Sequence, residues 1–362
     1  MPSAPLPPPE ASCPLPTADY PAVTLAHGGG GTLTDRLLHT ALAPLLPPVG
    51  APALRDAADV PLPQGTTAVF TTDTYVVDPP VFPGGTIGSL AVHGTLNDLA
   101  VAGAAPRALS VALVLQEGLP LDFLAIIAAD IRAAADAASV PIVTGDTKVV
   151  ERSPSATPTL YVNTAGVGAR PLDRPPPAPE RIVPGDAIVL TSPIAAHGIA
   201  VMGARMHLDF GPAARSDSAN LAPALLAAYE AAPGEIHCAR DATRSGLGGI
   251  LCELATAAGM PFRCDEPAIP VAPFAAAACE VLGLDPLFVA NEGCAALLVA
   301  PTAVEAVLAA LRAHPVTATA RVIGHVDPPS LDAPAGQVAL TTALGTTRVL
   351  TPPAGHQLPR IC

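Results

Sequence analysis

The first half of the chain alternates between two spacings of apolar residues. Four short runs are rich in β-branched and apolar residues, which is typical of strands. These predicted strands span residues 66–73, 108–117, 140–146 and 159–168. Between the second and third runs, apolar residues recur at intervals of three and four, which predicts one face of a helix. That face comprises Leu121, Leu124, Ile127, Ala128 and Ile131.

The same alternation continues through the rest of the chain. Residues 84–106 are predicted to be helical, with glycines that allow another group to approach the backbone closely. In the second half we predict strands at 186–192, 235–238 and 296–300, and helices at 220–232, 246–259 and 303–314. Strands that alternate with helices in both halves indicate an α/β fold.

Length and proline content divide the chain into segments. A chain of 362 residues exceeds what one core usually covers, so two domains are expected. A proline-rich stretch at 170–186 has the composition of a stiff surface connector. We therefore predict a disordered tail at 1–22, a first domain at 23–170, a linker at 171–184, a second domain at 185–350 and a mobile tail at 351–362.

Composition excludes several classes of function. The net charge of −13 disfavours a nucleic-acid partner, because such binding depends on Lys and Arg. No apolar run approaches the ~20 residues of a membrane helix, and the first residues lack a signal-peptide pattern. The seven cysteines are scattered, without a C-x-x-C pair, which disfavours a disulfide framework or a zinc site. We expect a cytoplasmic protein without a membrane or nucleic-acid partner.

Three acids in the first half are candidates for metal binding. Asp73 and Asp146 each follow an apolar run, and Asp98 lies beside Asn97 in the glycine-containing helix. Carboxylates at strand ends suit Mg²⁺, which takes a few hard oxygens together with substrate phosphates. Lys148 points the same way as Asp146 along an extended chain, where it can meet a phosphate. The alternative is that the acids are turn or N-cap residues and that the lysine is solvated.

A run of four glycines is a candidate phosphate loop. The run comprises Gly28, Gly29, Gly30 and Gly31 in AHGGGGT. Their N–H groups can surround phosphate oxygens, and Thr32 or Thr34 can open the next helix. No Gly-Lys-Ser/Thr follows, so this is not a P-loop, and a flexible linker is the alternative.

The second half offers further polar candidates. Asp241 and Arg244 precede a glycine-rich helix start, and Glu292 lies in the turn ANEGC between apolar segments. If that turn faces a cleft, burial raises the pKa of Glu292 and suits it to proton transfer; otherwise it is an ordinary turn residue. The chain ends on Cys362, and the twelve residues before and including it can span up to ~40 Å when extended. The thiol can therefore reach a cleft or a partner.

These motifs together resemble one family. The chain is similar to the HypE family of hydrogenase maturation proteins, in the aminoimidazole ribonucleotide synthetase (PurM-like) superfamily of ATP-using enzymes. The matching motifs are AHGGGG, TTDTYVVDPPVFPGG, QEGLP, PIVTGDTKVV, NTAGVG, RDATRSGLGG, ANEGC and the terminal PRIC. The resemblance covers nearly all of residues 23–362. It implies a two-domain α/β (α+β) architecture with a dimeric β-barrel-like core of first domains, an α/β sandwich as second domain and a flexible C-terminal tail.

The resemblance also implies an activity. A HypF-type carbamoyltransferase loads a carbamoyl group onto the thiol of Cys362, and the protein uses ATP and Mg²⁺ to dehydrate that group to a thiocyanate. The cyano group then passes to a HypC–HypD iron scaffold for [NiFe] hydrogenase. A homodimer is implied, in which one site draws on two chains.

Roles follow by matching motif to motif. The resemblance implies that Cys362, Lys148 and Glu292 are catalytic. It implies that the metal ligands are Asp73, Asp98 and Asp146. The nucleotide-binding group comprises the same three acids with Gly28, Gly29, Gly30, Gly31, Asn97, Asp241 and Arg244. Ser245 departs from the family, which usually has glycine there, and its Cβ is expected to crowd the turn beside Arg244.

Two other functions stay open. One is an ATP-dependent kinase or ligase of a small molecule within the same superfamily, which would use Asp73, Asp98 and Asp146 without needing Cys362. The other is a non-catalytic scaffold on which the tail docks. Such a scaffold would not hydrolyse ATP after carbamoylation.

Overall fold

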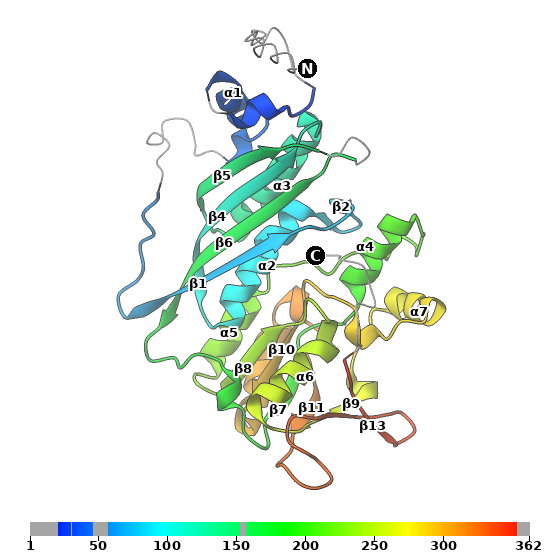
Figure 1. The fold of residues 1–362 in the computed structure, drawn as a ribbon. Helices are drawn as coiled ribbons and strands as arrows, with labels where there is room; N and C mark the ends of the chain where they lie inside the picture. Colours follow the sequence, from blue (N-terminus) through cyan, green and yellow to red (C-terminus); the bar gives the residue numbers. More distant parts are fainter. Residues whose placement is uncertain (1–20, 30, 46–56, 153–156, 353–362) are drawn as a thin grey trace, which may run out of the picture.

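Two domains, each built on its own sheet, lie one above the other (Figure 1). The computed structural model describes residues 21–29, 31–45, 57–152 and 157–352. The predictions for the two tails beyond these ranges, for Gly30 and for Cys362 lie outside the described residues.

The first domain contains a four-stranded sheet in the order β1-β6-β4-β5. Its strands are β1 (Thr66–Tyr75), β4 (Ala105–Gln116), β5 (Ile142–Val150) and β6 (Leu160–Pro171). β4 and β5 are parallel, and the other two pairs are antiparallel. Alternate side chains of β4 and β6 are buried in one core with helices α2 (Ile87–Val101) and α3 (Leu121–Ala137). In the strand order given above, β1 and β5 are the two edge strands of the sheet.

Smaller elements flank this sheet. They are η1 (Leu25–Gly28), α1 (Thr32–Thr40), η2 (Ala43–Leu45) and the hairpin of β2 (Val81–Phe82) and β3 (Gly85–Thr86). η1 lies beside β5. The helix expected after the glycine run begins at Thr32, as predicted, with Gly31 at its N-cap.

The second domain contains a seven-stranded sheet in the order β13-β12-β9-β11-β7-β10-β8. Its strands are β7 (Ala187–Leu190), β8 (Ile236–Asp241), β9 (Phe262–Asp265), β10 (Ala295–Val299), β11 (Arg321–Val326), β12 (Val338–Thr341) and β13 (Thr347–Val349). Its helices are α4 (Ala196–Met206), α5 (Ala222–Ala231), α6 (Gly246–Ala258), α7 (Pro273–Leu282) and α8 (Val304–Arg312). Five short 3₁₀ helices complete it: η3 (Pro179–Arg181), η4 (Glu266–Ala268), η5 (Pro286–Phe288), η6 (Pro301–Ala303) and η7 (Pro315–Thr317).

The burial of β10 shows that helices cover both faces of this sheet. Every residue of β10 is buried. Ala296 and Leu298 belong to the core with α6 and α7, whereas Leu297 and Val299 belong to the core with α5 and α8. Because successive strand side chains point to opposite faces, an uninterrupted apolar strand requires helices on both sides.

The structure confirms the strands and helices predicted from apolar spacing, but several predicted strands end too early. β1 continues to Tyr75 and β5 to Val150, so Asp73, Asp146 and Lys148 lie inside strands and not in turns after them. Edge strands keep their backbone pairing even where polar side chains alternate along them, so polarity alone did not mark their ends. The spacing did not predict α4, α7, β9, β11, β12 or β13.

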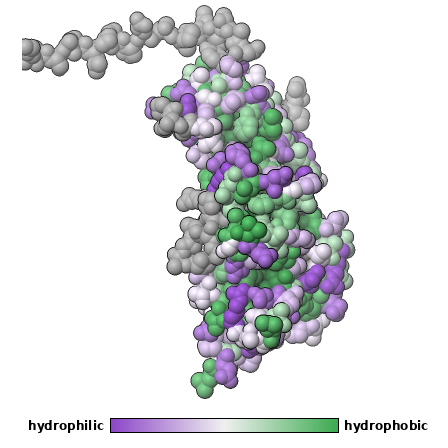
Figure 2. Space-filling view, turned by 90° about the vertical axis from the view of Figure 1, so that its right-hand side faces the viewer, coloured by the Kyte–Doolittle hydropathy of each residue, from purple (hydrophilic) through white to green (hydrophobic). Residues whose placement is uncertain are grey.

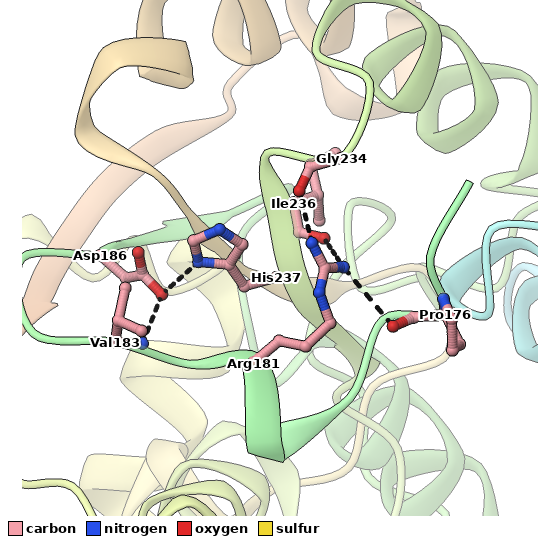
Figure 3. A network of polar contacts seen from close by, with 7 residues as sticks. All are labelled: Pro176, Arg181, Val183, Asp186, Gly234, Ile236 and His237. Carbon is pink, nitrogen blue, oxygen red and sulfur yellow. Dashed lines mark hydrogen bonds and ion pairs between the residues drawn. The ribbon is translucent and has the colours of Figure 1, made fainter. Parts of the chain in front are cut away.

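Side-chain hydrogen bonds hold the segment between the sheets. Arg181 donates to the carbonyl oxygens of Gly234 at 2.5 Å and Ile236 at 3.2 Å (Figure 3). Nearby, the buried carboxylate of Asp186 lies 2.8 Å from Nδ1 of His237 (Figure 3). These contacts fasten the later part of the proline-rich connector to the start of β8.

The C-terminal end of α2 joins the domains. The last carbonyls of a helix have no partner within the helix. Here Tyr229 of α5 donates to the carbonyl of Val101 at 2.8 Å, and Arg170 and Arg174 donate to the next two carbonyls. Cationic groups at a helix C-terminus also complement the helix dipole. α2 is thus held by the connector and by the second domain.

The surface carries mixed polarity. Among the described residues, no helix has both the length and the apolar character needed to cross a membrane. Hydrophilic and hydrophobic side chains are interspersed over the face seen in Figure 2. Apolar side chains are exposed at both edges of the first sheet, with Phe70 on β1 68% exposed and Val150 on β5 37% exposed.

Candidate active site

Four carboxylates converge where the two domains meet. Asp73 comes from β1, Asp98 from α2, Asp241 from the end of β8 and Glu292 from the turn before β10. The charges of Asp73, Asp98 and Asp241 all act on Glu292. We call these four residues the interface cluster. The structure therefore brings together acids that the sequence places in separate halves of the chain.

α2 connects the first domain to this cluster. Thr86 caps the helix through a capping box with Ser89, which sets where the helix begins. Near the other end, the hydroxyl of Thr71 on β1 donates to Asp98 at 2.7 Å. β1 and α2 thus present Asp73 and Asp98 on the side of the first domain that meets the second.

Asn97 makes its hydrogen bonds across the domain interface. Its Nδ2 donates to the carbonyl oxygens of Ala219 at 2.9 Å and Glu292 at 3.2 Å, and its Oδ1 accepts from the backbone of Leu221 at 2.7 Å. The side chain is buried. The amide predicted to bind nucleotide is therefore bonded to the backbone of the second domain.

Hydrogen bonds from several elements hold the turn that carries Glu292. Asn291 accepts from Ala195 at 2.6 Å and donates to Ala242 at 2.7 Å. Ser192 donates to the carbonyl of Gly293 at 2.7 Å. Glu292 itself is 3% exposed. Of the two alternatives that the sequence left open, an ordinary turn residue or a buried acid, the structure has the buried acid.

Burial dominates the electrostatics of the interface cluster. Desolvation, followed by the charges of Asp241 and Asp217, raises the pKa of Glu292 well above its ordinary value. Desolvation and the charge of Asp98 raise the pKa of Asp241 to about 7. Desolvation also raises the pKa of Asp98, although its bond from Thr71 opposes the change. Removing carboxylates from water while placing them close together disfavours their charged forms, so these acids hold their protons to a higher pH than exposed carboxyl groups do.

Arg240, and not Arg244, is the arginine that acts on this cluster. The charge of Arg240 lowers the pKa values of Asp98 and Asp241. Arg244 is exposed in the turn before α6. Ser245 adopts a left-handed conformation with φ of 63°, so this position accepts a residue other than glycine at a conformational cost.

A second group of predicted residues lies along β5. Lys148 Nζ is 2.9 Å from Asp146, and both side chains are more than 60% exposed. The hydrogen bond from Lys148 holds the pKa of Asp146 below its ordinary value. A Cβ at Gly28 would approach Val149 to 2.9 Å, so the glycine run passes close to β5 because it lacks side chains. We call Gly28, Asp146 and Lys148 the β5 group.

The first sheet separates these two groups within one chain. Asp73 lies opposite Thr164 on β6, which lies opposite Val111 on β4, which in turn lies opposite Gly145 on β5. Three strand spacings of about 4.8 Å amount to about 14 Å. Asp73, Asp98 and Asp146 therefore do not form one metal group in a single chain, and the described residues hold no set of three His, Cys, Asp or Glu side chains placed for a metal.

Three residues near the interface cluster were not predicted. Arg240 is one, and Asp217 is another: its carboxylate accepts from the backbone of Glu292 and Gly293. The third is Tyr75, which is buried at the end of β1. Burial and the charge of Asp73 raise the pKa of Tyr75 well above its ordinary value. Tyr75 stands two residues after Asp73, which is the one sequence signal that points to it.

Family profiles match both domains. The profile described as AIR synthase related protein, N-terminal domain, matches residues 54–169. The profile for the C-terminal domain of the same family matches residues 183–332. Together they cover most of the chain and establish the PurM-like two-domain α/β fold.

Individual relatives are similar along nearly the whole chain. Carbamoyl dehydratase HypE of Rhizobium leguminosarum bv. viciae is 44% identical over 342 residues, covering 94% of this chain and 95% of the relative. A crystal structure of hydrogenase maturation protein HypE in complex with ATP has a TM-score of 0.86 and 41% identity, covering 93% of this chain and 99% of that chain. A crystal structure of a HypE–HypF complex is similar with a TM-score of 0.74 and 34% identity, and the match covers 81% of this chain and 93% of that chain.

A more distant structure shares the fold alone. Thiamine monophosphate kinase from Aquifex aeolicus is similar with a TM-score of 0.55 and 14% identity, covering 81% of this chain and 93% of that chain. At this identity the likeness carries no information about substrate.

Proposed function

The chain belongs to the HypE family of carbamoyl dehydratases, and from this we propose that it uses ATP to dehydrate a carbamoyl group carried on the thiol of Cys362. The product is a thiocyanate that supplies the cyanide ligand for [NiFe] hydrogenase maturation. The observation that carries the proposal is the position of Glu292, a buried acid of raised pKa inside a carboxylate cluster at the domain interface. A cation bound nearby would lower that pKa toward neutrality and keep the carboxylate ionised, so that Glu292 can accept a proton.

The proposed reaction has two steps, phosphorylation of the carbamoyl oxygen and elimination of phosphate. The carbamoyl oxygen attacks the γ-phosphorus of ATP and releases ADP, while the nitrogen loses one proton. Loss of the second nitrogen proton then expels phosphate and leaves a carbon–nitrogen triple bond on sulfur. Glu292 is the base in this scheme, and Lys148 offsets the negative charge that develops at the phosphorylated oxygen.

The donor set of the interface cluster fits Mg²⁺. Asp73 and Asp98 offer hard carboxylate oxygens of the kind that Mg²⁺ takes, and burial raises the pKa of Asp98. We propose that these two acids hold the ion together with Asp146 of a second copy. When bound, Mg²⁺ neutralises phosphate charge. The chain's own glycines Gly28 to Gly31 are proposed to hold the phosphates through backbone N–H groups.

A homodimer would unite the interface cluster with the β5 group. One face of the first sheet lacks a covering helix in the described chain, and its edges expose Phe70 and Val150. Two such sheets closed face to face would bury these side chains and form a barrel-like core. If β5 of one copy lies beside β1 of the other, Lys148 and Asp146 reach the acids of the second chain. We propose this shared site because a single chain separates the two groups.

The proposed partners follow from the family. A HypF-type carbamoyltransferase would load Cys362, and a HypC–HypD iron complex would accept the cyano group. We place the protein in the cytoplasm, where a thiol remains reduced. Solved structures of HypE with ATP and with HypF support the nucleotide and the first of these partners.

Intact-mass analysis tests the function directly. After incubation with the carbamoyltransferase and its substrates, the chain should gain one carbamoyl unit at Cys362. Addition of ATP and Mg²⁺ should then remove one water. An unchanged mass after ATP, despite successful loading, would contradict the proposed reaction.

The second candidate is an ATP-dependent kinase or ligase of a small molecule, which would use the carboxylates of the interface cluster. That activity would not require the terminal thiol. Cys362→Ala should abolish product formation if the tail is the substrate. Full turnover of a free small molecule by this variant would favour the alternative.

A further inference from the structure

A loop of the second domain contacts both domains beside the interface cluster. We call residues 216–221 the clasp loop. The backbone N–H of Ser216 donates to the carbonyl of Pro83 in the β2–β3 hairpin at 2.8 Å, and Ser218 bonds His93 of α2 at 3.1 Å. Toward its own domain, Ser216 bonds His197 of α4 at 2.8 Å. The loop is therefore anchored on three elements.

The carboxylate of Asp217 in this loop binds the turn that carries Glu292. One oxygen accepts from the backbone N–H of Glu292 at 3.2 Å, and the other accepts from that of Gly293 at 3.1 Å. A Cβ at position 293 would overlap the backbone carbonyl of Asp217. Only glycine at 293 therefore permits this approach.

The same turn is held from the first domain. Asn97 donates to the carbonyl of Glu292 at 3.2 Å and to the carbonyl of Ala219 in the clasp loop at 2.9 Å. The backbone N–H of Glu292 thus has its partner in the clasp loop, and the backbone carbonyl has its partner in α2. A buried acid surrounded by other carboxylates is repelled by them, so its direction depends on how firmly the backbone beneath it is held.

We propose that Asp217 is a positioning residue that aims Glu292 at the reacting carbamoyl nitrogen. Hydrogen bonds from N–H groups to a carboxylate are stronger than those between neutral groups, so this pair fixes the turn more firmly than a neutral side chain would. The inference rests on the proposed function, because it takes Glu292 as the base. It adds a residue outside the sequence motifs to the machinery of that reaction.

The direction of the Asp217 pKa is compatible with this role. Desolvation raises the pKa of Asp217 to about 6, while the N–H groups of Gly293 and Glu292 oppose the rise. The side chain is thus ionised at pH 7.5 and can accept both bonds. Without those N–H groups, burial alone would push the pKa higher and neutralise the acceptor.

Asp217→Asn tests the proposal. The amide keeps one acceptor and turns an N–H group toward an N–H of the turn, so the turn loses one of its two bonds. Thiocyanate formation should fall about 10- to 100-fold in kcat, as is usual when a supporting contact of a reacting group is lost. The KM for ATP should stay within about twofold, because the change is confined to the base.

Ser218→Ala is the matched control in the same loop. It removes the bond to His93 but leaves Asp217 and the turn untouched. Its melting temperature should fall while kcat stays at the wild-type value. If Ser218→Ala loses kcat as strongly as Asp217→Asn, or if Asp217→Asn keeps kcat, the positioning role is overturned.

Two further variants keep the outcomes distinguishable. Should Asp217→Asn fail to fold, Asp217→Ser keeps a small acceptor without the opposing N–H, and it should again lower kcat with an unchanged KM. An unchanged kcat in a folded Asp217→Ser variant would overturn the proposal. Glu292→Gln tests the premise. If this variant still forms thiocyanate, Glu292 is not the base and the positioning role of Asp217 is overturned with it, whereas a wild-type protein that forms no thiocyanate would overturn the proposed function itself. An inactive Glu292→Gln beside a fully active Asp217→Asn removes only the inference about Asp217.

Discussion

The interface cluster and the β5 group contain the same kind of side chain in opposite electrostatic conditions. At the interface, burial raises the pKa of Glu292 and Asp241. On β5, contact with Lys148 in open solvent lowers the pKa of Asp146. The acids of the interface cluster therefore hold their protons to higher pH. In the β5 group, the positive charge of Lys148 keeps Asp146 ionised. Burial, more than residue type, decides which carboxylate can act as a base near neutral pH.

The largest effect is expected from Glu292→Gln. Removing the base should lower thiocyanate formation by about 10²- to 10⁴-fold, the usual contribution of a positioned acid or base. Because one buried acid is removed from a crowded group, the melting temperature should rise. Glu280→Gln, at an exposed position of α7, is the control and should change neither quantity. Parallel assays of turnover and thermal unfolding measure both effects, and wild-type turnover in Glu292→Gln would remove this acid from the reaction.

Mixing two inactive variants sharpens the comparison between the two groups. Lys148→Ala and Glu292→Gln should each be inactive as homodimers. If one site takes Lys148 from one copy and Glu292 from the other, a heterodimer retains one intact site, and random mixing recovers about a quarter of wild-type activity. The measurement is turnover after the two chains are unfolded and refolded together. No recovery in confirmed heterodimers would place both residues of a site on one chain.

The pH dependence of stability should follow the interface cluster and its neighbour Asp217. The pKa of Asp217 rises from 3.8 to about 6, and that of Asp241 to about 7. A carboxyl group with a raised pKa binds its proton more tightly in the folded state than in the unfolded state. The stability that the folded protein gains in this way is fully present below pH 3.8 and is lost as the pH rises through 6 to 7. The melting temperature of the nucleotide-free protein should therefore fall between pH 5 and pH 7.5. Thermal unfolding at a series of pH values tests this.

The same measurement has two internal controls. Asp241→Asn should flatten the fall, whereas Asp146→Asn should leave it unchanged because that acid is solvated. Addition of Mg²⁺ should raise the melting temperature more at pH 7.5 than at pH 5. A melting temperature that rises steadily from pH 5 to pH 7.5 would contradict the raised pKa values.

The smallest effect is expected from the exposed ion pair itself. Asp146→Asn removes the contact with Lys148, and the free energy of unfolding should change by less than about 1 kcal/mol, as for most exposed pairs. Added salt should weaken the wild-type pair and shrink the difference. Chemical denaturation of both proteins at two salt concentrations measures it. A loss of several kcal/mol would contradict the weak coupling expected of an exposed ion pair.

Prediction from sequence worked where the signal is local. Apolar spacing located α3 and the buried strand β10, and the i, i+2 relation placed Lys148 and Asp146 on one side of an extended chain, which their 2.9 Å contact confirms. Glu292 was singled out as an acid in a turn between apolar segments, and the resemblance of ANEGC to the family supplied its proposed role. Asp217 was missed because its partners are backbone N–H groups 75 and 76 residues away, which leave no pattern in the sequence.

The alternation of strands and helices, the family and the residue types available for chemistry can all be read from the amino-acid sequence, because they depend on neighbouring residues and on short motifs. Which acids are buried, and which edge of the sheet each one occupies, depends on how the chain packs. The order β1-β6-β4-β5 places Asp73 and Asp146 on opposite edges. Strand order arises from contacts between distant segments, so the grouping of the four interface acids, and their raised pKa values, exist only once both domains have folded against each other.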